Sequence, residues 1–546
     1  MTISCKPRSS LEGQSFQAII IGGGINGVAV ARECARAGRR TLLVEQNDFA
    51  SGVTSRSTRI IHGGLRYLEH GELDLVRESV RERDRLLGER SHLVHPAHFL
   101  FLMNENSRRS AMKVRAGLWL YRRLAGKAAS AGTSEMEIKR VERALDAGHR
   151  WSLFNYEDAQ CEFPERLVAE WLTEAIDAGA VVRNHAEVLA IDVAHGRARG
   201  ILLRDRTSNR DERIDGAWII NCTGPWADRI CQRSSIRISQ PMLGGVRGSH
   251  IVLPRFSGAP NAALYTEAAD GRPVFVIPWN EQIMVGTTEV EDTNDPGKAV
   301  PSNEEIEYLL QAVTELFPRA KIKAHDIKYA FAGIRPLPYS PGRRSSAVTR
   351  RHFLHDHSDD GAARMISVIG GKLTTAAALA RECARKIGLL VAEPKAIGVV
   401  PGTALDPLLD QAVVEIARAG SVSEESARGI VEWHGKRAVD IARTALVSAE
   451  LRAPICPHTS HIVAEVVEAY RKECAVTLGD VLLRRVPVAL GPCWSDSCSR
   501  EAALRIGAVL GWDEQAMGAN LESFEMERSA FVRRPTRSVA LEAAAD

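Results

Sequence analysis

Apolar residues before Pro401 fall into short runs that are separated by amphipathic stretches. The runs 18–21, 41–44 and 217–223 contain almost no charged positions, which is typical of parallel strands buried on both faces. Between the first two runs, residues 28–37 carry the small and apolar side chains of a helix that packs on a sheet. Strands that alternate with helices predict an α/β fold with a parallel sheet.

Later in this part of the chain the pattern is that of a β-rich region. Residues 274–279 and 282–288 are apolar runs separated by two polar residues, as in a hairpin. A third run, 328–334, leads into Arg335. We expect these strands to form a sheet that covers a ligand.

After Pro401 the period of the apolar positions becomes helical. The apolar residues between 462 and 470 share one helix face, and Ser421 and Glu424 have the spacing of a capping box. We therefore expect an all-helical domain over 400–532. Residues 1–15 and 533–546 are expected to be flexible tails.

The composition is ordinary for a soluble protein. Charged residues make up 25% of the 546 residues and the net charge is +3, so nucleic acid is not expected as a partner. No run of about 18 apolar residues could span a membrane, and residues 1–15 lack the apolar core of a signal peptide. We therefore expect a cytoplasmic protein.

Residue types that bind metals are present but do not form a familiar motif. The ten cysteines include no C-x-x-C pair, so neither zinc nor a disulfide framework is expected. His352, His355, Asp356 and His357 lie close in sequence, but a polar hairpin explains them. No metal is expected.

The first apolar run leads directly into Gly22-x-Gly24-x-x-Gly27. Missing side chains let the backbone approach a pyrophosphate, and the start of the following helix offers free N–H groups and a positive dipole end. Ile25 and Asn26 lie inside this turn. Glu45 closes the second run, where a carboxylate accepts hydrogen bonds from ribose hydroxyls. Together these features predict a site for FAD or NAD.

Residues 51–70 combine hydroxyls, arginines and a His-Gly-Gly segment directly after the ribose-binding strand. Hydroxyls and small residues approach phosphate closely and arginines bind its oxygens, so the segment suits a loop that contacts the cofactor and an anionic substrate. A solvated, serine-rich loop is the competing interpretation. The expected cofactor-binding residues here are Thr54, Ser55, Ser57, Thr58, His62, Gly63 and Gly64.

Two later turns also follow apolar runs. The first ends the run 217–223, and the second joins the run 364–369 to a helix predicted over 376–389, whose first N–H groups can face a ligand. The residues expected at the cofactor from these turns are Thr223, Gly224, Trp226, Gly370, Gly371, Lys372, Leu373 and Thr374.

Together these segments resemble the FAD-dependent glycerol-3-phosphate dehydrogenases, the quinone-linked flavoproteins of glycerol catabolism. The matching segments occur in order between roughly residues 18 and 390, and as a set they are far more specific than any one of them. They are IIGGGINGVAVARECARAG, STRIIHGGLRYLEHGELDLVRESVRER, NCTGPWAD, GSHIVLPR, VFVIPWNEQIMVGTTEVE, FAGIRPL, AVTRRHFLHDH and SVIGGKLTT.

The resemblance implies a discontinuous FAD-binding Rossmann-like domain, a β-rich substrate domain and the C-terminal helical domain. It further implies FAD as the cofactor and oxidation of sn-glycerol 3-phosphate to dihydroxyacetone phosphate, with electrons passing to a membrane quinone. We also expect a homodimer. The FAD-binding domain is expected over 16–90, 155–235 and 340–395, and the substrate domain over 91–154 and 236–339.

The resemblance places Arg66, Tyr67, Arg335 and Lys372 at the substrate, with Arg350 as a further candidate. Their chemistry agrees with that placement, because the cations can hold a phosphate dianion and the tyrosine hydroxyl can donate a hydrogen bond.

Two histidines are candidates for the proton of the substrate hydroxyl, because imidazole titrates near neutral pH. We favour His62 over His250, because the His-Gly-Gly segment lies closest to the flavin in the family, and Arg335 would stabilise the developing alkoxide. In this hypothesis hydride leaves C2 for the flavin N5 while His62 receives the proton. The competing interpretation is a His62 that only hydrogen-bonds flavin or backbone.

The chain departs from the family pattern at several positions. Arg59 stands where a lysine is usual, and Ala376-Ala377 replace a Tyr-Arg pair, which would remove bulk and a cation near the flavin. These departures leave open a longer polyol phosphate, such as erythritol phosphate, as the substrate. They also leave open two further functions: an oxygen-using glycerol-phosphate oxidase and a flavin-binding scaffold without turnover.

A cationic stretch with an apolar centre lies between residues 108 and 127. It is typical of an amphipathic helix on a membrane surface, and equally of a helix packed on its own domain. Its apolar centre is Leu118, Trp119, Leu120 and Tyr121, and its cations are Arg108, Arg109, Lys113, Arg115, Arg122, Arg123 and Lys127.

Overall fold

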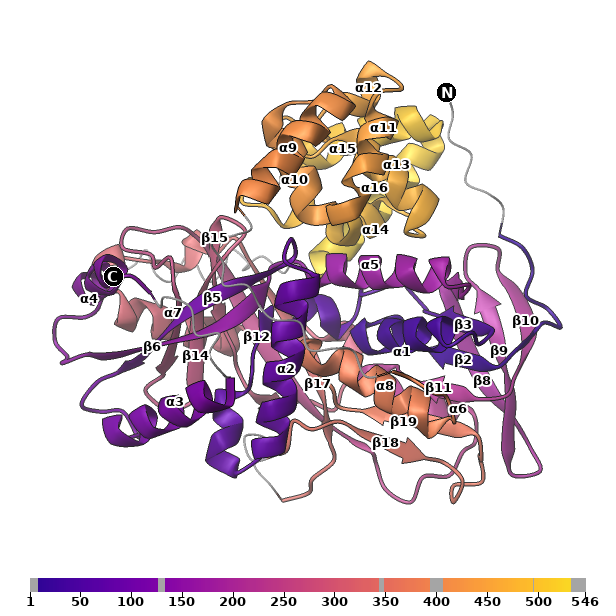
Figure 1. Ribbon diagram of the computed structural model, residues 1–546, viewed down its shortest axis with the longest axis horizontal. Coiled ribbons are helices and arrows are strands. Elements are labelled where there is room, and N and C mark those ends of the chain that lie inside the picture. Colours follow the sequence, from indigo (N-terminus) through magenta and orange to yellow (C-terminus); the bar gives the residue numbers. More distant parts are fainter. Residues whose placement is uncertain (1–7, 126–132, 343–347, 393–405, 494, 532–546) are drawn as a thin grey trace.

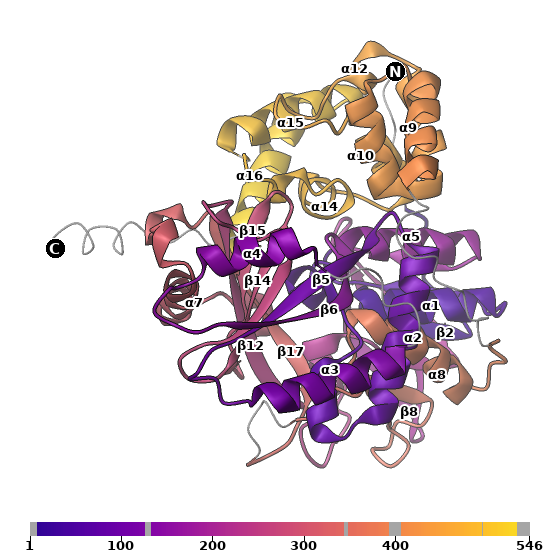
Figure 2. The ribbon, with the colours of Figure 1, turned by 60° about the vertical axis from the view of Figure 1, so that its left-hand side comes forward.

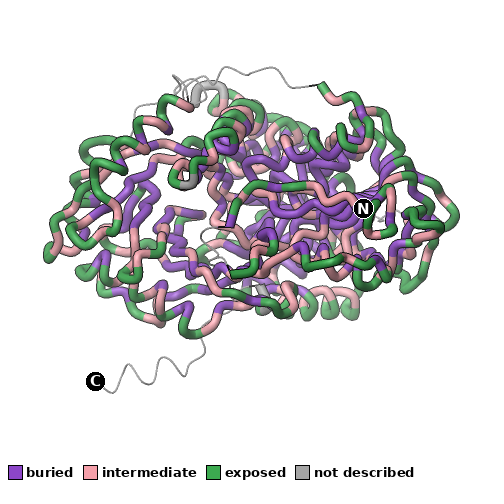
Figure 3. The backbone as a smooth tube through the Cα atoms, turned by 90° about the horizontal axis from the view of Figure 1, so that it is seen from below, coloured by how far each residue is buried: buried purple, intermediate pink, exposed green. Residues whose placement is uncertain are grey.

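The computed structural model describes residues 8–125, 133–342, 348–392, 406–493 and 495–531. In Figures 1 and 2 a broad body of sheets and helices carries the C-terminal helices on one side. Buried positions are concentrated in the strands inside this body, as the view in Figure 3 shows. Lys127 and the predicted tail 533–546 lie outside the described residues. Of the predicted tail 1–15, residues 1–7 lie outside them.

The predicted FAD-binding domain contains a six-stranded sheet in the order β18-β19-β11-β2-β3-β7. All neighbours pair in parallel except β18 and β19, which are antiparallel. This arrangement confirms the α/β fold that the apolar runs predicted. The strands are β2 (Ala18–Ile21), β3 (Thr41–Val44), β7 (Val181–Arg183), β11 (Ile219–Asn221), β18 (Phe353–Asp356) and β19 (Met365–Ile369).

Three helices cover one face of this sheet and pack on one another, because α1 contacts both α5 and α8. Their small residues allow the close approach; Ala29, Ala31 and Ala380 are completely buried. The helices are α1 (Ile25–Arg36), α5 (Pro164–Asp177) and α8 (Ala376–Lys386). The registers β2–β3, β2–β11 and β11–β19 bring the carboxyl ends of four strands, and the turns that follow them, to one edge.

A small four-stranded sheet, in the order β1-β10-β9-β8, lies at the other side of this domain and shares an apolar core with the six-stranded sheet. Its strands are β1 (Ser15–Phe16), β8 (Ala186–Ala194), β9 (Arg197–Asp205) and β10 (Arg210–Gly216). The short helix α6 (Ala227–Arg233) contacts β8.

The predicted substrate domain contains a nine-stranded sheet in the order β16-β12-β15-β14-β13-β5-β6-β4, with β17 also paired to β12. The predicted hairpin is confirmed, since β14 and β15 pair in antiparallel. The strands are β4 (Ile60–Ile61), β5 (Val94–Met103), β6 (Ser152–Cys161), β12 (Leu243–Pro254), β13 (Ala263–Glu267), β14 (Pro273–Trp279), β15 (Gln282–Gly286), β16 (Val290–Glu291) and β17 (Tyr329–Pro338).

This sheet crosses two of the domain boundaries placed from sequence. β6 runs without interruption through 154 and 155, and it pairs with β4, which lies inside the segment 16–90. The reason is that β6 pairs along its whole length with β5, so its second half stays in the same sheet. The helices of this region are α2 (Leu73–Glu89), α3 (Ala111–Ala125), α4 (Glu135–Ala144) and α7 (Asn303–Leu316).

The C-terminal part is helical, as predicted. One detail of the prediction is wrong: the N-cap of α10 is Ser423, whose hydroxyl accepts a hydrogen bond from the Ser426 N–H, whereas Ser421 has a positive φ of 53° in the preceding turn. The helices are α9 (Asp406–Gly420), α10 (Glu424–His434), α11 (Ala438–Ala445), α12 (Ala449–Arg452), α13 (Val463–Lys472), α14 (Leu478–Asp480), α15 (Asp496–Leu510) and α16 (Glu514–Phe531).

Among the described residues, no helix combines the length and the apolar character needed to cross a bilayer.

A buried ion-pair network fastens the helical domain to the FAD-binding domain. Asp48, which follows β3, accepts hydrogen bonds from Arg484 and from both terminal nitrogens of Arg485, the latter at 2.7 and 2.8 Å. The side-chain amide of Asn184 donates to the same carboxylate at 2.9 Å. Because all these groups are buried, each needs its partners to replace the interactions with water that it has lost.

We expect the Asp48→Asn substitution to lower the free energy of unfolding by about 3–5 kcal/mol, because it leaves two buried guanidinium groups without their carboxylate. Urea unfolding followed by circular dichroism measures the change. The matched control is Asp211→Asn, which breaks the exposed pair with Arg204 (2.7 Å) and should cost less than about 1 kcal/mol. Equal losses in the two variants would show that the Asp48 network does not hold the domains together.

Candidate active site

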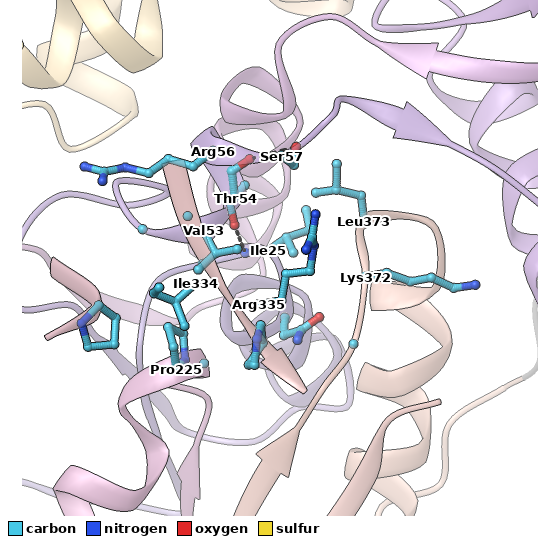
Figure 4. Close-up of a pocket in the computed structure, with 18 of the residues that line it drawn as sticks. Ile25, Val53, Thr54, Arg56, Ser57, Pro225, Ile334, Arg335, Lys372 and Leu373 are labelled. Atoms are coloured by element: carbon cyan, nitrogen blue, oxygen red, sulfur yellow. Dashed lines mark hydrogen bonds between the residues drawn. The ribbon is translucent and has the colours of Figure 1, made fainter. Parts of the chain in front are cut away.

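A cavity of about 940 Å³ lies where the carboxyl edge of the six-stranded sheet faces the nine-stranded sheet. Its wall contains the glycine turns after β2 and β19, the turn after β11, and side chains from β12, β14 and β17. Figure 4 shows residues from these separate segments around one space. Segments far apart in the sequence therefore share one site.

The glycine turn after β2 has the geometry that the motif predicted. Gly22 has a positive φ of 103°. A Cβ on Gly27 would lie 1.8 Å from the Gly22 carbonyl oxygen, so only glycine lets α1 start this close to the strand. The Thr54 hydroxyl accepts a hydrogen bond from the Ile25 N–H (3.1 Å), which attaches the 51–70 segment to the helix start (Figure 4).

Glu45 lies at the end of β3, beside the glycine turn. Its carboxylate accepts hydrogen bonds from the Gly23 N–H (2.7 Å) and the Asn47 N–H (2.9 Å). Burial raises the pKa of Glu45, while these two hydrogen bonds oppose the rise. The side chain lines the cavity and is fixed where a ribose hydroxyl of a dinucleotide would reach it.

Asn26 joins the first glycine turn to the turn after β19. Its amide nitrogen donates to the Gly370 carbonyl (3.2 Å), and a Cβ on Gly371 would lie 2.5 Å from the same nitrogen. The amide oxygen of Asn26 is buried and has no hydrogen-bond partner within the described part of the chain. A cradle of bare backbone, an unsatisfied buried acceptor and a fixed carboxylate fit FAD.

Three arginines meet around one carboxylate at the other end of the cavity. Arg66 and Arg350 both approach the same oxygen of Glu289, at 3.7 and 3.2 Å. Arg335 donates to the Thr287 hydroxyl (2.8 Å), and its pKa is lowered to about 10, first by burial and then by the charge of Arg350. This end of the cavity is therefore strongly electropositive.

Lys372 belongs to a neighbouring group rather than to the three arginines. Its side chain extends away from Arg335 in Figure 4, and its ammonium donates to the Ser79 hydroxyl (2.6 Å) and lies 4.3 Å from the centre of the Tyr67 ring. Burial lowers the pKa of Lys372 to about 7. Arg350 connects the two groups, because its charge acts on both Arg335 and Tyr67.

Both candidate histidines line the cavity. Burial and the charges of Lys372 and Arg350 lower the pKa of His62 to about 3, and burial lowers that of His250 to about 3 as well. The His250 ring stacks on Phe331 and its Nε2 lies 3.0 Å from the Thr58 hydroxyl. Both rings are therefore neutral at physiological pH.

Most residues expected at the cofactor or substrate line the cavity, but four do not. Gly27 and Gly64 serve close packing of the backbone, and Ser55 donates its hydroxyl to the Ala50 carbonyl (2.6 Å). Gly63 donates its N–H to Asp158 (2.9 Å), which itself lines the cavity, and to the Tyr121 hydroxyl. These four residues therefore support the cavity wall without lining it.

Several residues that line the cavity were not predicted from the sequence. Glu289 lies in the segment VFVIPWNEQIMVGTTEVE, which resembles the family. The expected cluster of cations could have pointed to it, because such a cluster needs an acidic partner. Arg484 and Glu527 come from the helical domain and lie near Arg56, an arginine of the 51–70 segment whose pKa is lowered to about 10 by burial. No sequence signal places Arg484 and Glu527 at the cavity, because the domain contact brings them there.

The two departures from the family pattern at Arg59 and Ala376-Ala377 take part in packing. Arg59 forms a fully buried pair with Glu165 (2.9 Å) and stacks on Trp279. Ala376, the first residue of α8, is buried in the core, and neither it nor Ala377 lines the cavity, so this exchange does not enlarge the described site.

The histidines near β18 belong to a polar hairpin, as expected. His355 and His357 both hydrogen-bond to the carboxylate of Asp360, at 2.7 and 2.8 Å.

Comparison with known proteins agrees with this architecture. Residues 17–385 match the family model of FAD-dependent oxidoreductases, and residues 365–517 match a model described as the C-terminal domain of alpha-glycerophosphate oxidase. The fold and the site thus define an FAD-dependent oxidoreductase.

Proteins of similar sequence identify the family within the FAD-dependent oxidoreductases. A glycerol-3-phosphate dehydrogenase from Synechocystis sp. is 36% identical over 499 residues, which cover 88% of this chain and 90% of the relative. A D-erythritol 1-phosphate dehydrogenase from Brucella abortus is 33% identical over 368 residues, or 67% of this chain and 72% of that protein. The chain belongs to the FAD-dependent glycerol-3-phosphate dehydrogenase family, and FAD is its cofactor.

A solved structure shows the same fold. The glycerol-3-phosphate dehydrogenase from Bacillus halodurans in complex with FAD superimposes with a TM-score of 0.73 at 21% identity, over 95% of this chain and 96% of that one.

We expect Gly27→Ala to abolish stable FAD binding, because the new Cβ would push α1 away from the glycine turn. The ratio of flavin to protein absorbance after purification measures the FAD content. Gly117→Ala, in α3 with open space around its Cβ position, is the matched control and should keep the FAD content of the unmodified protein. Full FAD content in Gly27→Ala would contradict the role of this contact.

Proposed function

We propose that the protein oxidises sn-glycerol 3-phosphate to dihydroxyacetone phosphate and passes the electrons to a membrane quinone. The observation that carries the proposal is the concentration of buried positive charge in the cavity, where Arg66 and Arg350 share one carboxylate of Glu289. A phosphate dianion supplies the missing negative charge. Bound FAD supplies a hydride acceptor at N5.

The arginines are suited to hold phosphate in one orientation. Their planar guanidinium groups donate in pairs, and Arg335 and Arg350 are both largely removed from water, which strengthens each charge-assisted hydrogen bond. Arg335 lies on β17, which pairs with β12 along its length, so its position is set by the sheet. We assign Arg335, Arg350 and Arg66 to substrate binding, and Arg335 also to stabilising the alkoxide that forms on C2.

We assign the proton of the substrate hydroxyl to His62. The neutral imidazole can accept it, and Lys372 and Arg350 are cations that help keep its pKa low in the absence of substrate. A bound phosphate offsets those two charges and so raises the proton affinity of the ring when the substrate is present. Tyr67, next to His62 and Lys372, keeps its hydroxyl proton because burial raises its pKa, and it acts as a donor.

We expect His62→Gln to slow reduction of the flavin by glycerol 3-phosphate by about 10²–10⁴-fold, because the hydroxyl proton loses its acceptor. Anaerobic stopped-flow measurement of flavin bleaching gives the rate. His325→Gln, an exposed position, is the control and should react at the normal rate. A normal rate in His62→Gln together with a slow His250→Gln variant would move the role to His250.

Substrate capture should depend on the protonation of Lys372. Because burial lowers its pKa to about 7, the free enzyme loses this positive charge as pH rises through that value, whereas the substrate phosphate stays a dianion. We expect kcat/KM to fall above about pH 7. Lys372→Arg keeps its charge, so its kcat/KM should be lower but should not fall between about pH 7 and 9. The same decline in both proteins would assign it to another group.

A longer polyol phosphate is the second candidate substrate, and the Brucella abortus relative favours it. Anaerobic bleaching of the flavin by a series of phosphorylated polyols distinguishes the substrates by kcat/KM. The same experiment tests whether the protein is a scaffold, because a protein without turnover bleaches with none of them.

Oxygen is the second candidate electron acceptor, because the family model that matches the C-terminal domain is named after an oxidase. A dehydrogenase reduces a soluble quinone analogue without air, whereas an oxidase consumes one oxygen molecule per substrate oxidised. The homodimer stays a prediction that light scattering tests.

Peripheral contact with the membrane is supported by one face of α3. Val114, Leu118 and Tyr121 are buried against the domain, while Met112 and Trp119 are 79% and 64% exposed. Cations on the same helix are exposed as well, including Lys113 and Arg123, and these can meet anionic headgroups. The helix therefore packs on its own domain and still presents an apolar and cationic outer face.

We expect the protein to sediment with anionic vesicles at low salt, and the double variant Trp119→Ser/Arg123→Glu to lose most of that binding, because both the apolar contact and the charge attraction weaken. Arg443→Glu, an exposed charge reversal on the helical domain, is the control and should bind normally. Equal binding of all three proteins would exclude α3 as the contact.

A further inference from the structure

Three cysteines and a histidine from separate parts of the helical domain meet at its surface. Ligand atoms of Cys456, His458 and Cys498 all lie within 4.8 Å of one another. The thiol of Cys493 lies beside them, 3.8 Å from the His458 carbonyl oxygen. Cys456 and Cys498 are buried, whereas His458 and Cys493 are exposed, so the group forms a cup that opens to solvent.

The first two ligands come from a closed loop. Cys456 and His458 lie between α12 and α13, where a bridge joins Pro454 to Ile462 and the Ile455 N–H donates to the His461 carbonyl at 2.8 Å. A closed loop of this kind holds the two side chains in place. Their spacing is C-x-H, one residue closer than the C-x-x-C pairs that are typical of zinc sites.

The other two ligands lie at and just before the start of α15. The Ser495 hydroxyl caps the helix by accepting the Cys498 N–H, so the Cys498 thiol lies in the first turn, at the positive end of the helix dipole. The Cys498 sulfur lies 3.3 Å from His458 Nδ1 and accepts a hydrogen bond from the Ser495 hydroxyl at 3.5 Å. Thiolates are the form of cysteine that binds metals, and the positive end of a helix dipole favours a thiolate.

We propose that Cys456, His458, Cys493 and Cys498 bind a tetrahedral Zn²⁺ ion. Three sulfur donors and one imidazole are a ligand set of structural zinc sites. Binding replaces the protons of the three thiols, which leave to solvent, and no oxidant or reductant is needed for Zn²⁺. The hydrogen bond of His458 Nδ1 to the Cys498 sulfur, at 3.3 Å, gives way to coordination of both to the metal.

The centre would join two parts of the domain that are far apart in sequence. It links the loop before α13 to the start of α15, beside core residues such as Ile455 and Ala502. The other histidine of the loop, His461, is already bonded to Glu465 and stacked on Trp433, so it stays outside the centre. The ligand set is therefore the four residues of the cup.

The test is metal analysis of the full chain, purified with its FAD and without a polyhistidine tag. We expect about one Zn²⁺ per chain, whereas iron with acid-labile sulfide in place of zinc, or no bound metal, would overturn the proposal. Cys456→Ser and Cys498→Ser should each lose at least about tenfold in bound metal. Cys474→Ser, a cysteine of the same domain outside the cup, is the matched control and should keep the metal.

A second measurement does not depend on the folding of variants. Removing the metal from the unmodified protein with a chelator should make the exposed thiol of Cys493 reactive and leave the FAD content unchanged, which separates this centre from the flavin site. A protein that carries no metal and shows a Cys456–Cys498 disulfide by mass spectrometry would overturn the proposal, as would metal retained in both serine variants.

Discussion

Burial of several positive charges in one cavity is the constraint on which this molecule depends. Taking a guanidinium group out of water costs several kcal/mol unless negative partners replace the solvent. Arg66 and Arg350 approach the same carboxylate oxygen of Glu289, and Arg335 is held by a hydroxyl and a carbonyl of the 287–288 segment. The fold therefore maintains an electropositive cavity, which suits the proposed anionic substrate, and the strands around it fix the positions of the cations.

The architecture supplies that rigidity from three directions. The six-stranded sheet presents its glycine turns at one edge, the nine-stranded sheet carries Arg335 on the long strand β17, and the helical domain reaches the same cavity with Arg484. Since Arg484 also forms an ion pair with Asp48, which lines the same cavity, buried charge links the helical domain to the proposed flavin site. The C-terminal domain is in this way part of the site as well as an appendage.

The cysteine and histidine cup lies in a different part of that domain, and the interaction proposed there is metal coordination rather than ion pairing. The described core beneath α13 and α15 contains both buried cysteines, so sulfur already fills space there before any ligand binds. Its open side carries the two exposed ligands, Cys493 and His458. The arginine network fastens the domain to its neighbour, whereas a metal at the cup would hold the domain together internally.

The sequence alone determined the features that depend on neighbouring residues. The strand, glycine turn and helix at 18–36, the acid at Glu45 and the hairpin of β14 and β15 follow from local periodicity and backbone sterics. Tertiary structure alone decided that Lys372 turns toward Tyr67, that β6 stays in one sheet, and that Cys456 meets Cys498. The reason is physical: such contacts join residues far apart in the chain, and their energy depends on packing and burial that no short pattern encodes.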